Sequence, residues 1–179
     1  DLAAARHWLD RAEQVRPDYP KIAATRALLA VREGDTAAAL EAIDHAHRLA
    51  PDDVEIAVNY GAILIQRERF ADARRVLQTA LRASPSHTEA IYNLALADDL
   101  AGRADRAAYG YGRFLALASH ADPQRARVQQ RLELLMGANV PAAPAPVSTA
   151  GATTASANDS ERGSAVAAPS PESREGTHP

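Results

Sequence analysis

The stretch of sequence that decides the fold runs from Val54 to His87 and reads VEIAVNYGAILIQRERFADARRVLQTALRASPSH. Apolar residues recur in it at steps of three and four on both sides of a turn at 67–70, which predicts two amphipathic helices. Pro85 follows the second helix, where its missing N–H and fixed φ forbid further helix. The stretch therefore predicts one pair of helices that ends at a proline-containing turn.

The same pattern returns along the chain at one fixed spacing. Pro17, Pro51 and Pro85 recur at equal intervals, since 51−17=34 and 85−51=34. Apolar residues keep this phase, and a further shift reaches Ala107 and Tyr111. A period of this length indicates a repeat protein in which each unit packs on its neighbours. The residues in phase are Ala5, Leu9 and Ala12, then Ala39, Ile43 and Ala46, then Ala73, Leu77 and Ala80.

The first helix of the quoted stretch carries Ala57, Tyr60, Gly61 and Leu64, and Phe70 stands at its turn. In this order it resembles the tetratricopeptide repeat family. The resemblance implies an all-α fold, a right-handed superhelical solenoid of antiparallel helix pairs. The residues expected to pack the repeats are Ala39, Ile43, Ala46, Pro51, Gly61, Ala73, Leu77, Ala80, Pro85, Leu94, Ala107 and Tyr111.

The resemblance extends over residues 1–121 and predicts how the chain is divided. Residues 1–19 are interpreted as a half repeat without its first helix, and three whole repeats follow at 20–53, 54–87 and 88–121. Within the first of them, Gly34 is predicted to stop one helix in a left-handed conformation, and Asp35 or Thr36 to cap the next.

Residues 122–137 are predicted to form one capping helix, with Asp122 as its N-cap and Pro123 at its first position. Its expected buried stripe is Val128, Leu132 and Leu135, and its expected solvent face is Arg125, Arg127 and Arg131. Residues 138–179 consist mostly of Ala, Pro, Ser, Thr and Gly without periodicity. They offer too little apolar surface to offset the entropy of ordering, so a disordered tail is predicted.

Composition narrows the class of protein. The apolar fraction is 46% with only 4% aromatic residues, which favours closely packed helices over a sheet. The formal net charge of -3 provides no basic field for nucleic acid. Cysteine is absent, which excludes disulfides and thiolate metal sites, and no apolar run is long enough to span a membrane.

The compartment stays open at this level. Almost all basic residues are Arg, which together with the Ala and Pro excess is typical of a GC-rich bacterial gene. The sequence opens at Asp1 without a leader segment, but a leader could have been removed or lie upstream. The cell envelope, the periplasm and the cytoplasm all remain open, and so does self-association through exposed edges.

Several residues could suggest chemistry but have simpler interpretations. His45 and His47 are two apart on a helix and point in different directions, so they cannot converge on one metal ion. Asp98 and Asp99 diverge in the same way and are interpreted as solvated or partner-facing. No metal, cofactor or catalytic residue is predicted, and the chain is not expected to be an enzyme. The turn residues Ser84, Ser86 and His87 are interpreted as helix caps.

Two aromatic features keep two interpretations each. Trp8 covers the edge left by the missing helix or belongs to an interface, where Trp is enriched. Tyr109 and Tyr111 alternate with Gly110 and Gly112 in an expected helix. Either the glycines allow close packing against a neighbouring helix, or a kink exposes Tyr109.

The resemblance also implies a function. In the family, the first helices of the units form a concave groove that holds an extended peptide or a partner helix, and recurrent asparagines clamp the backbone of the ligand. Asn59 and Asn93 are 93−59=34 apart, and Thr25 stands at the matching place before them. The groove would also carry Lys21, Leu28, Arg32, Val58, Ile65, Gln66, Glu89, Tyr92, Leu96 and Asp99.

The expected function is therefore a non-catalytic scaffold that binds a protein or peptide partner. The residues do not identify the partner, although their mixed character favours a peptide with some apolar side chains. The alternative is a regulatory or substrate-recruiting segment of a larger enzyme whose catalytic domain lies upstream.

Overall fold

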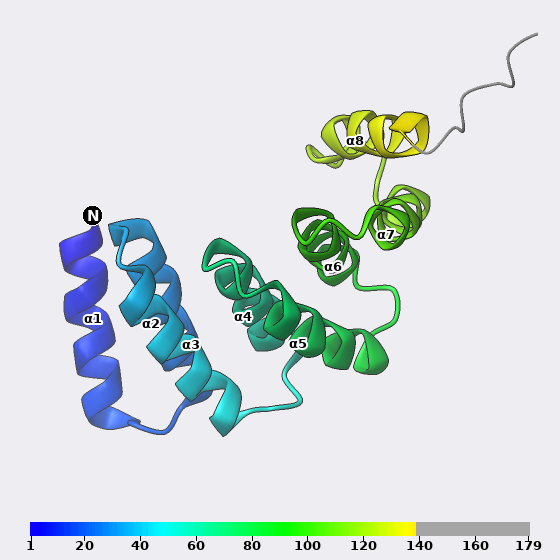
Figure 1. Cartoon of the computed structure of the whole chain (residues 1–179). Coiled ribbons are helices and arrows are strands. Elements are labelled where there is room, and N and C mark those ends of the chain that lie inside the picture. The colour runs from blue at the N-terminus through cyan, green and yellow to red at the C-terminus, as the bar shows by residue number, and fades with distance from the viewer. Residues whose placement is uncertain (139–179) are drawn as a thin grey trace, which may run out of the picture. The chain divides into compact units, whose positions relative to one another are not determined.

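The structure is a computed structural model that describes residues 1–138. This part of the chain consists of helices without any strand (Figure 1). The helices are α1 Leu2–Val15, α2 Pro20–Glu33, α3 Thr36–Leu49, α4 Val54–Gln66, α5 Phe70–Ala83, α6 Thr88–Leu100, α7 Ala104–Leu117 and α8 Arg125–Ala138.

Each helix of this part contacts only helices one or two places away in the chain. Antiparallel pairs form from α2 and α3, from α4 and α5, and from α6 and α7, as Figure 1 shows. The helices α2, α4 and α6 also contact each other in sequence order. The predicted all-α solenoid is thus confirmed, because contacts of this kind define a quasi-one-dimensional stack.

The turns inside the pairs share one backbone feature. Gly34 and Gly102 have φ of 81° and 72°, and Glu68 has φ of 57° between them. The three positions follow the repeat, because 68−34=34 and 102−68=34, so each unit ends its first helix with a left-handed residue. Asp35 then accepts a hydrogen bond from Ala38 N at 2.9 Å, which makes Asp35 the cap of α3.

The core is a continuous series of three hydrophobic clusters along the stack. The predicted packing residues of the second helices are fully or almost fully buried. Gly61 allows the closest approach inside a pair, because a Cβ there would lie 2.6 Å from Leu77 Cγ. Leu94 differs from the expectation for a packing residue, since it is only partly buried.

The end helices differ from the rest. The helix α1 has no buried residue, and Trp8 is 64% exposed, with Arg11 above its ring at 5.8 Å. The helix α8 begins at Arg125, so the prediction that Pro123 is its first residue was wrong. The side chain of Asp122 accepts a hydrogen bond from Gln124 N at 2.8 Å and so forms a tight turn, and the helix therefore begins only after this turn.

The predicted tail at 138–179 lies outside the described residues, except that Ala138 belongs to α8.

Candidate partner-binding surface

The inner side of the stack is formed by α2, α4 and α6 (Figure 1). Polar side chains on each of these helices contact the following unit, either in the turn before its first helix or on that helix itself. Two residues predicted to face a partner take part, because Lys21 and Asp99 both form ion pairs between units. The ion pairs are Lys21 with Asp53 at 3.1 Å and Arg131 with Asp99 at 2.7 Å. A hydrogen bond of 3.0 Å joins His87 Nε2 to Glu55 in the same way.

The two asparagines of the predicted ladder lie on α4 and α6. Asn59 is partly exposed, whereas only 7% of Asn93 is exposed. Neither side-chain amide has a hydrogen-bond partner within residues 1–138. Thr25 behaves differently, since its hydroxyl donates to Lys21 O at 2.7 Å within its own helix. The amides of Asn59 and Asn93 are therefore free to bond an outside group, whereas the Thr25 hydroxyl can only accept from one.

Val58 and Ile65 were predicted to line the groove, but only 1% and 8% of their surfaces are exposed. They belong to a cluster with Ala90 and Ala97 of α6. These two side chains therefore pack α4 against the next unit and cannot contact a partner in this conformation.

The other predicted residues keep accessible surface. Tyr92 and Leu96 are partly exposed, and the side chain of Lys21 is 57% exposed although it is paired. Leu28 is 42% exposed. The other exposed members of the set are Arg32, Gln66 and Glu89.

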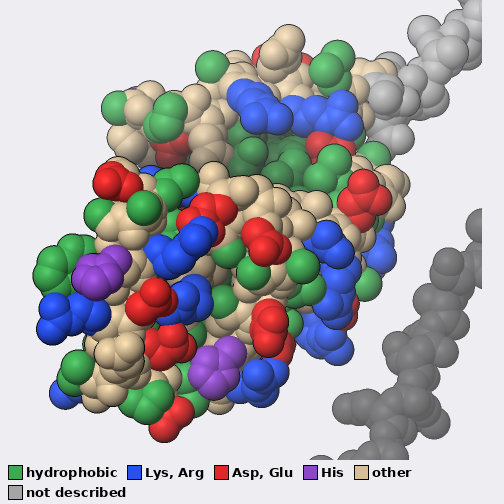
Figure 2. Space-filling view, turned by 90° about the vertical axis from the view of Figure 1, so that its left-hand side faces the viewer, with side chains coloured by type: hydrophobic (Ala, Val, Ile, Leu, Met, Phe, Trp, Pro, Cys, Tyr) green, Lys and Arg blue, Asp and Glu red, His purple; other side chains and the backbone are tan. Residues whose placement is uncertain are grey.

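A cleft of about 400 Å³ lies between α6 and α8. It contains Tyr92, Leu96 and Asp99 from the predicted set. Across from them, α8 contributes Leu134 and the arginines Arg127 and Arg131. Figure 2 shows a hollow lined with hydrophobic side chains beneath Lys and Arg side chains, near the end of the described chain.

The contribution of α8 to this surface was not predicted from the sequence. The repeat spacing does indicate it, because Arg127 stands one repeat after Asn93, at 127−93=34. Arg127 thus occupies on α8 the repeat position that Asn59 and Asn93 hold on α4 and α6. Arg125 was also misassigned to solvent. It donates to Leu115 O at 2.6 Å and to Ala118 O at 3.2 Å, which stabilises the end of α7.

Asp99 is held in the charged form. Its carboxylate accepts from Arg131 Nε at 2.8 Å and from the Tyr111 hydroxyl at 3.1 Å. The bond from Arg131 lowers the pKa of Asp99, and it outweighs the opposite effect of burial. Burial, followed by the nearby Asp99 charge, raises the pKa of Tyr111. Asp99 therefore stabilises the junction of α6 with α8 and is not simply solvated, contrary to the sequence interpretation.

Asp98 is also not solvated, since only 4% of it is exposed. Its Oδ1 lies 2.7 Å from Arg74 Nε on α5 and 3.3 Å from Arg103 Nη1. The Arg74 contact is an ion pair without hydrogen-bond alignment. The two neighbouring carboxylates thus point to different units, and they form no acid–base pair.

The remaining candidates have structural roles. His87 caps α6, because its Nδ1 accepts from Ala90 N at 3.3 Å. The ring of His47 packs on Tyr60, with centroids 5.4 Å apart. No three His, Asp or Glu residues within residues 1–138 are grouped to hold a metal ion, and no helix there is long and apolar enough to cross a membrane.

The two interpretations of the glycines on α7 can now be separated. A Cβ on Gly110 would lie 2.7 Å from the Ala95 Cβ, whereas one on Gly112 would meet nothing within 4 Å. Tyr109 is 71% exposed on a helix that runs without interruption. Close packing therefore explains Gly110, and no kink is needed to expose Tyr109.

Comparisons with known proteins agree on one fold. Two family profiles described as tetratricopeptide repeat match residues 30–83 and 61–126. No curated protein matches the sequence.

Similar solved structures include MamA 41-end from Desulfovibrio magneticus RS-1, with a TM-score of 0.68 and 20% identity over 76% of this chain and 75% of that one. The Arabidopsis OM64 TPR domain has a TM-score of 0.60 and 16% identity over 66% of this chain and 95% of that one. The first TPR of Spaghetti (RPAP3), bound to an HSP90 peptide, has a TM-score of 0.61 and 17% identity over 66% and 91%. At these identities the likeness concerns the fold.

Proposed function

The chain belongs to the tetratricopeptide repeat family, and on that premise we propose that it is a non-catalytic scaffold that holds an extended peptide or a partner helix. The inner face of α2, α4 and α6 is the proposed binding surface. Proteins of this family are protein-interaction scaffolds, so the general class follows from the family. The location of the site and the role of its residues are specific to the proposal.

The observation that carries the proposal is the pair of unpartnered amides, Asn59 and Asn93, one repeat apart on the inner helices. A side-chain amide offers a donor and an acceptor together, which matches the N–H and C=O of a peptide backbone. Both amides therefore keep their donor and acceptor available for the backbone of a bound peptide.

The size of the cleft supports a peptide-sized ligand. The cleft next to α8 could take one apolar side chain between Leu96 and Leu134, with Arg127 at its border. The structural neighbour RPAP3 was solved with the HSP90 peptide SRMEEVD. This indicates that a short peptide can be held by the fold, and it does not identify the ligand of this chain.

A test begins with peptides selected on the full chain from a random display library. A selected peptide is titrated by calorimetry against the chain and the Asn59→Ala/Asn93→Ala variant. We expect affinity to fall by about one to two orders of magnitude, since each neutral hydrogen bond contributes roughly 0.5–1.5 kcal/mol.

The thermal midpoint should stay the same or rise, because alanine is the better helix former. Gln14→Ala on α1 serves as the matched control, since Gln14 is an exposed amide outside the inner face. Unchanged affinity in a folded double variant would place the binding site elsewhere.

A further inference from the structure

Three junctions between units can be compared residue by residue on the outer side of the stack. At each one, a first helix packs between two second helices, as α4 does between α3 and α5. One position of these first helices is held by Arg26, Tyr60 and Leu94, which follow the repeat because 60−26=34 and 94−60=34. The first two bond the preceding helix at equivalent residues, with Arg26 to Asp10 and Tyr60 to Asp44 both at 2.9 Å.

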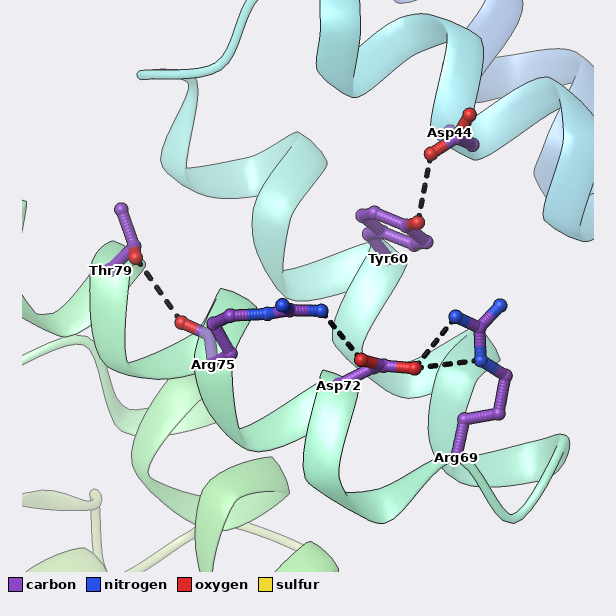
Figure 3. A network of polar contacts seen from close by, with 6 residues as sticks. All are labelled: Asp44, Tyr60, Arg69, Asp72, Arg75 and Thr79. Carbon is purple, nitrogen blue, oxygen red and sulfur yellow. Dashed lines mark hydrogen bonds and ion pairs between the residues drawn. The ribbon is translucent and has the colours of Figure 1, made fainter.

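The middle junction is filled by the ring of Tyr60. Figure 3 shows the hydroxyl of Tyr60 on α4 pointing at Asp44. On the neighbouring α5, Arg69 and Arg75 both bond Asp72. The His47 ring packs on Tyr60, and Tyr60 also packs against the cluster that contains the buried Val76 of α5. The middle junction therefore accommodates an aromatic ring with a hydrogen-bonded hydroxyl, whereas the first junction holds Arg26 at this position.

The third junction lacks all four of these groups. One repeat further along the chain, Leu94 replaces Tyr60, Gln78 replaces Asp44, Leu81 replaces His47 and Gly110 replaces Val76. A cleft of about 460 Å³ lies at this place, and these four residues line it. The space that Tyr60 occupies in one junction is thus left open in the next.

The walls of this cleft carry more positive than negative groups. Arg74, Arg106 and Arg113 line it together with two aspartates, Asp98 and Asp105. Asp98 is already paired with Arg74 and is only 4% exposed. The excess of one arginine over the aspartates in the lining favours a segment with carboxylates.

We propose that the cleft between α5, α6 and α7 is a second docking surface, which takes an aromatic side chain of a partner peptide flanked by acidic residues. The ring would lie on Leu94 in the place that Tyr60 fills one unit earlier, and Gln78 would bond its hydroxyl. Tyr109, 71% exposed, contributes a second ring at the border. This surface is separate from the inner face and does not depend on the function proposed for it.

The probe is the peptide acetyl-Glu-Glu-Tyr-Glu-Glu-amide, titrated into the isotope-labelled full chain and followed by amide NMR shifts. We expect the shifts to concentrate around Leu94, Ala95 and Gly110 and not around Asn59. Replacing the tyrosine of the peptide by alanine should weaken binding by about tenfold or more, because the ring that fills the cleft is gone. Replacing its four glutamates by lysine should have an effect of the same size, because the charges that face the arginines are reversed.

A variant that fills the cleft from within gives the sharpest test. Leu94→Tyr/Gln78→Asp rebuilds the pair formed by Tyr60 and Asp44, so the chain supplies its own ring. We expect peptide affinity to fall by about tenfold or more while the helical content is retained.

A surface variant keeps the proposal testable if the filled variant does not fold. Arg106→Glu should weaken the acidic peptide several-fold and leave acetyl-Ala-Ala-Tyr-Ala-Ala-amide unaffected, with Arg82→Glu on α5 as the matched control. Shifts confined to the inner face, equal binding of the tyrosine and alanine peptides, or an unaltered affinity of the folded filled variant would each overturn the proposal.

Discussion

Glu68 occupies a backbone conformation that glycine adopts in the two equivalent turns. Its φ is 57°, against 81° at Gly34 and 72° at Gly102. A residue with a side chain costs roughly 1–2 kcal/mol in the left-handed region, and glycine avoids this cost. Glycine also gives the unfolded chain more conformational entropy, which lowers the free energy of unfolding by roughly 0.4–1 kcal/mol. We predict that Glu68→Gly raises the free energy of unfolding by about 0.5–1 kcal/mol, measured by urea denaturation. Glu68→Ala is the control, and an equal gain there would attribute the effect to the lost carboxylate.

At the scale of one helix pair, the contact of Gly61 with Leu77 determines how closely α4 and α5 approach. Leu77 is fully buried, and a Cβ on Gly61 would lie 2.6 Å from its Cγ. Leu77→Ala should therefore cost about 2–5 kcal/mol by leaving a cavity, and Gly61→Ala about 1–3 kcal/mol by overpacking.

The double variant tests whether the two costs arise from one contact. In Gly61→Ala/Leu77→Ala the new methyl group enters space vacated by leucine, so the total cost should fall below the sum by about 0.5–3 kcal/mol. Chemical denaturation of all four proteins gives this coupling. Strict additivity would mean that the helices move apart instead of closing on this contact.

The junction between α6 and α8 should weaken in acid. The pKa of Asp99 is lowered in the folded chain by Arg131, so the folded state holds its proton less tightly than the unfolded state does. The stabilisation is therefore complete above the usual Asp pKa of about 4 and is lost as pH falls through the lower folded value.

The corresponding variant is Asp99→Asn. Above about pH 4 the parent chain should be more stable than this variant, and the difference should disappear below about pH 4. Thermal melts of both chains at several pH values measure this difference. The relevant quantity is the difference in stability between the two chains, because Asp53 also has a lowered pKa and is present in both. Burial alone would raise the pKa of Asp53, but its hydrogen bond from Ile56 N–H and its interactions with Lys21 together outweigh this effect. A difference that stays constant with pH would contradict a charged Asp99 at this junction.

At the scale of the whole molecule, the sequence was sufficient for the fold because the fold is local. Each repeat restores the same packing contacts, so the phase of Ala39, Ala73 and Ala107 alone indicated the stack. The surface was less predictable. Val58 and Ile65 became buried because the rotation of α4 against α6 is set by packing between units, which the period does not encode. Asp98 was misread for a similar reason, since Arg74, which pairs with it, lies on α5 in the preceding unit.

The same locality makes a prediction about cooperativity. The helix α1 has no buried residue, and α8 makes its backbone contacts with α7 only. The ends should therefore open without the middle, and amide hydrogen exchange should be fastest in α1 and α8 and slowest in α4 to α6. Val128, which is 1% exposed, fixes α8 on α7, so Val128→Ala should loosen that end by about 2 kcal/mol.

Exchange in this variant distinguishes a stack from a single cooperative unit. If units couple only to their neighbours, amides of α8 exchange faster and those of α2 and α3 keep the rates of the parent chain. Leu77→Ala, placed in the middle, should instead accelerate exchange in α4, α5 and α6 together. Equal acceleration of all helices by Val128→Ala would show that the stack unfolds as one body, in which case an inner-face ligand would stabilise both ends equally.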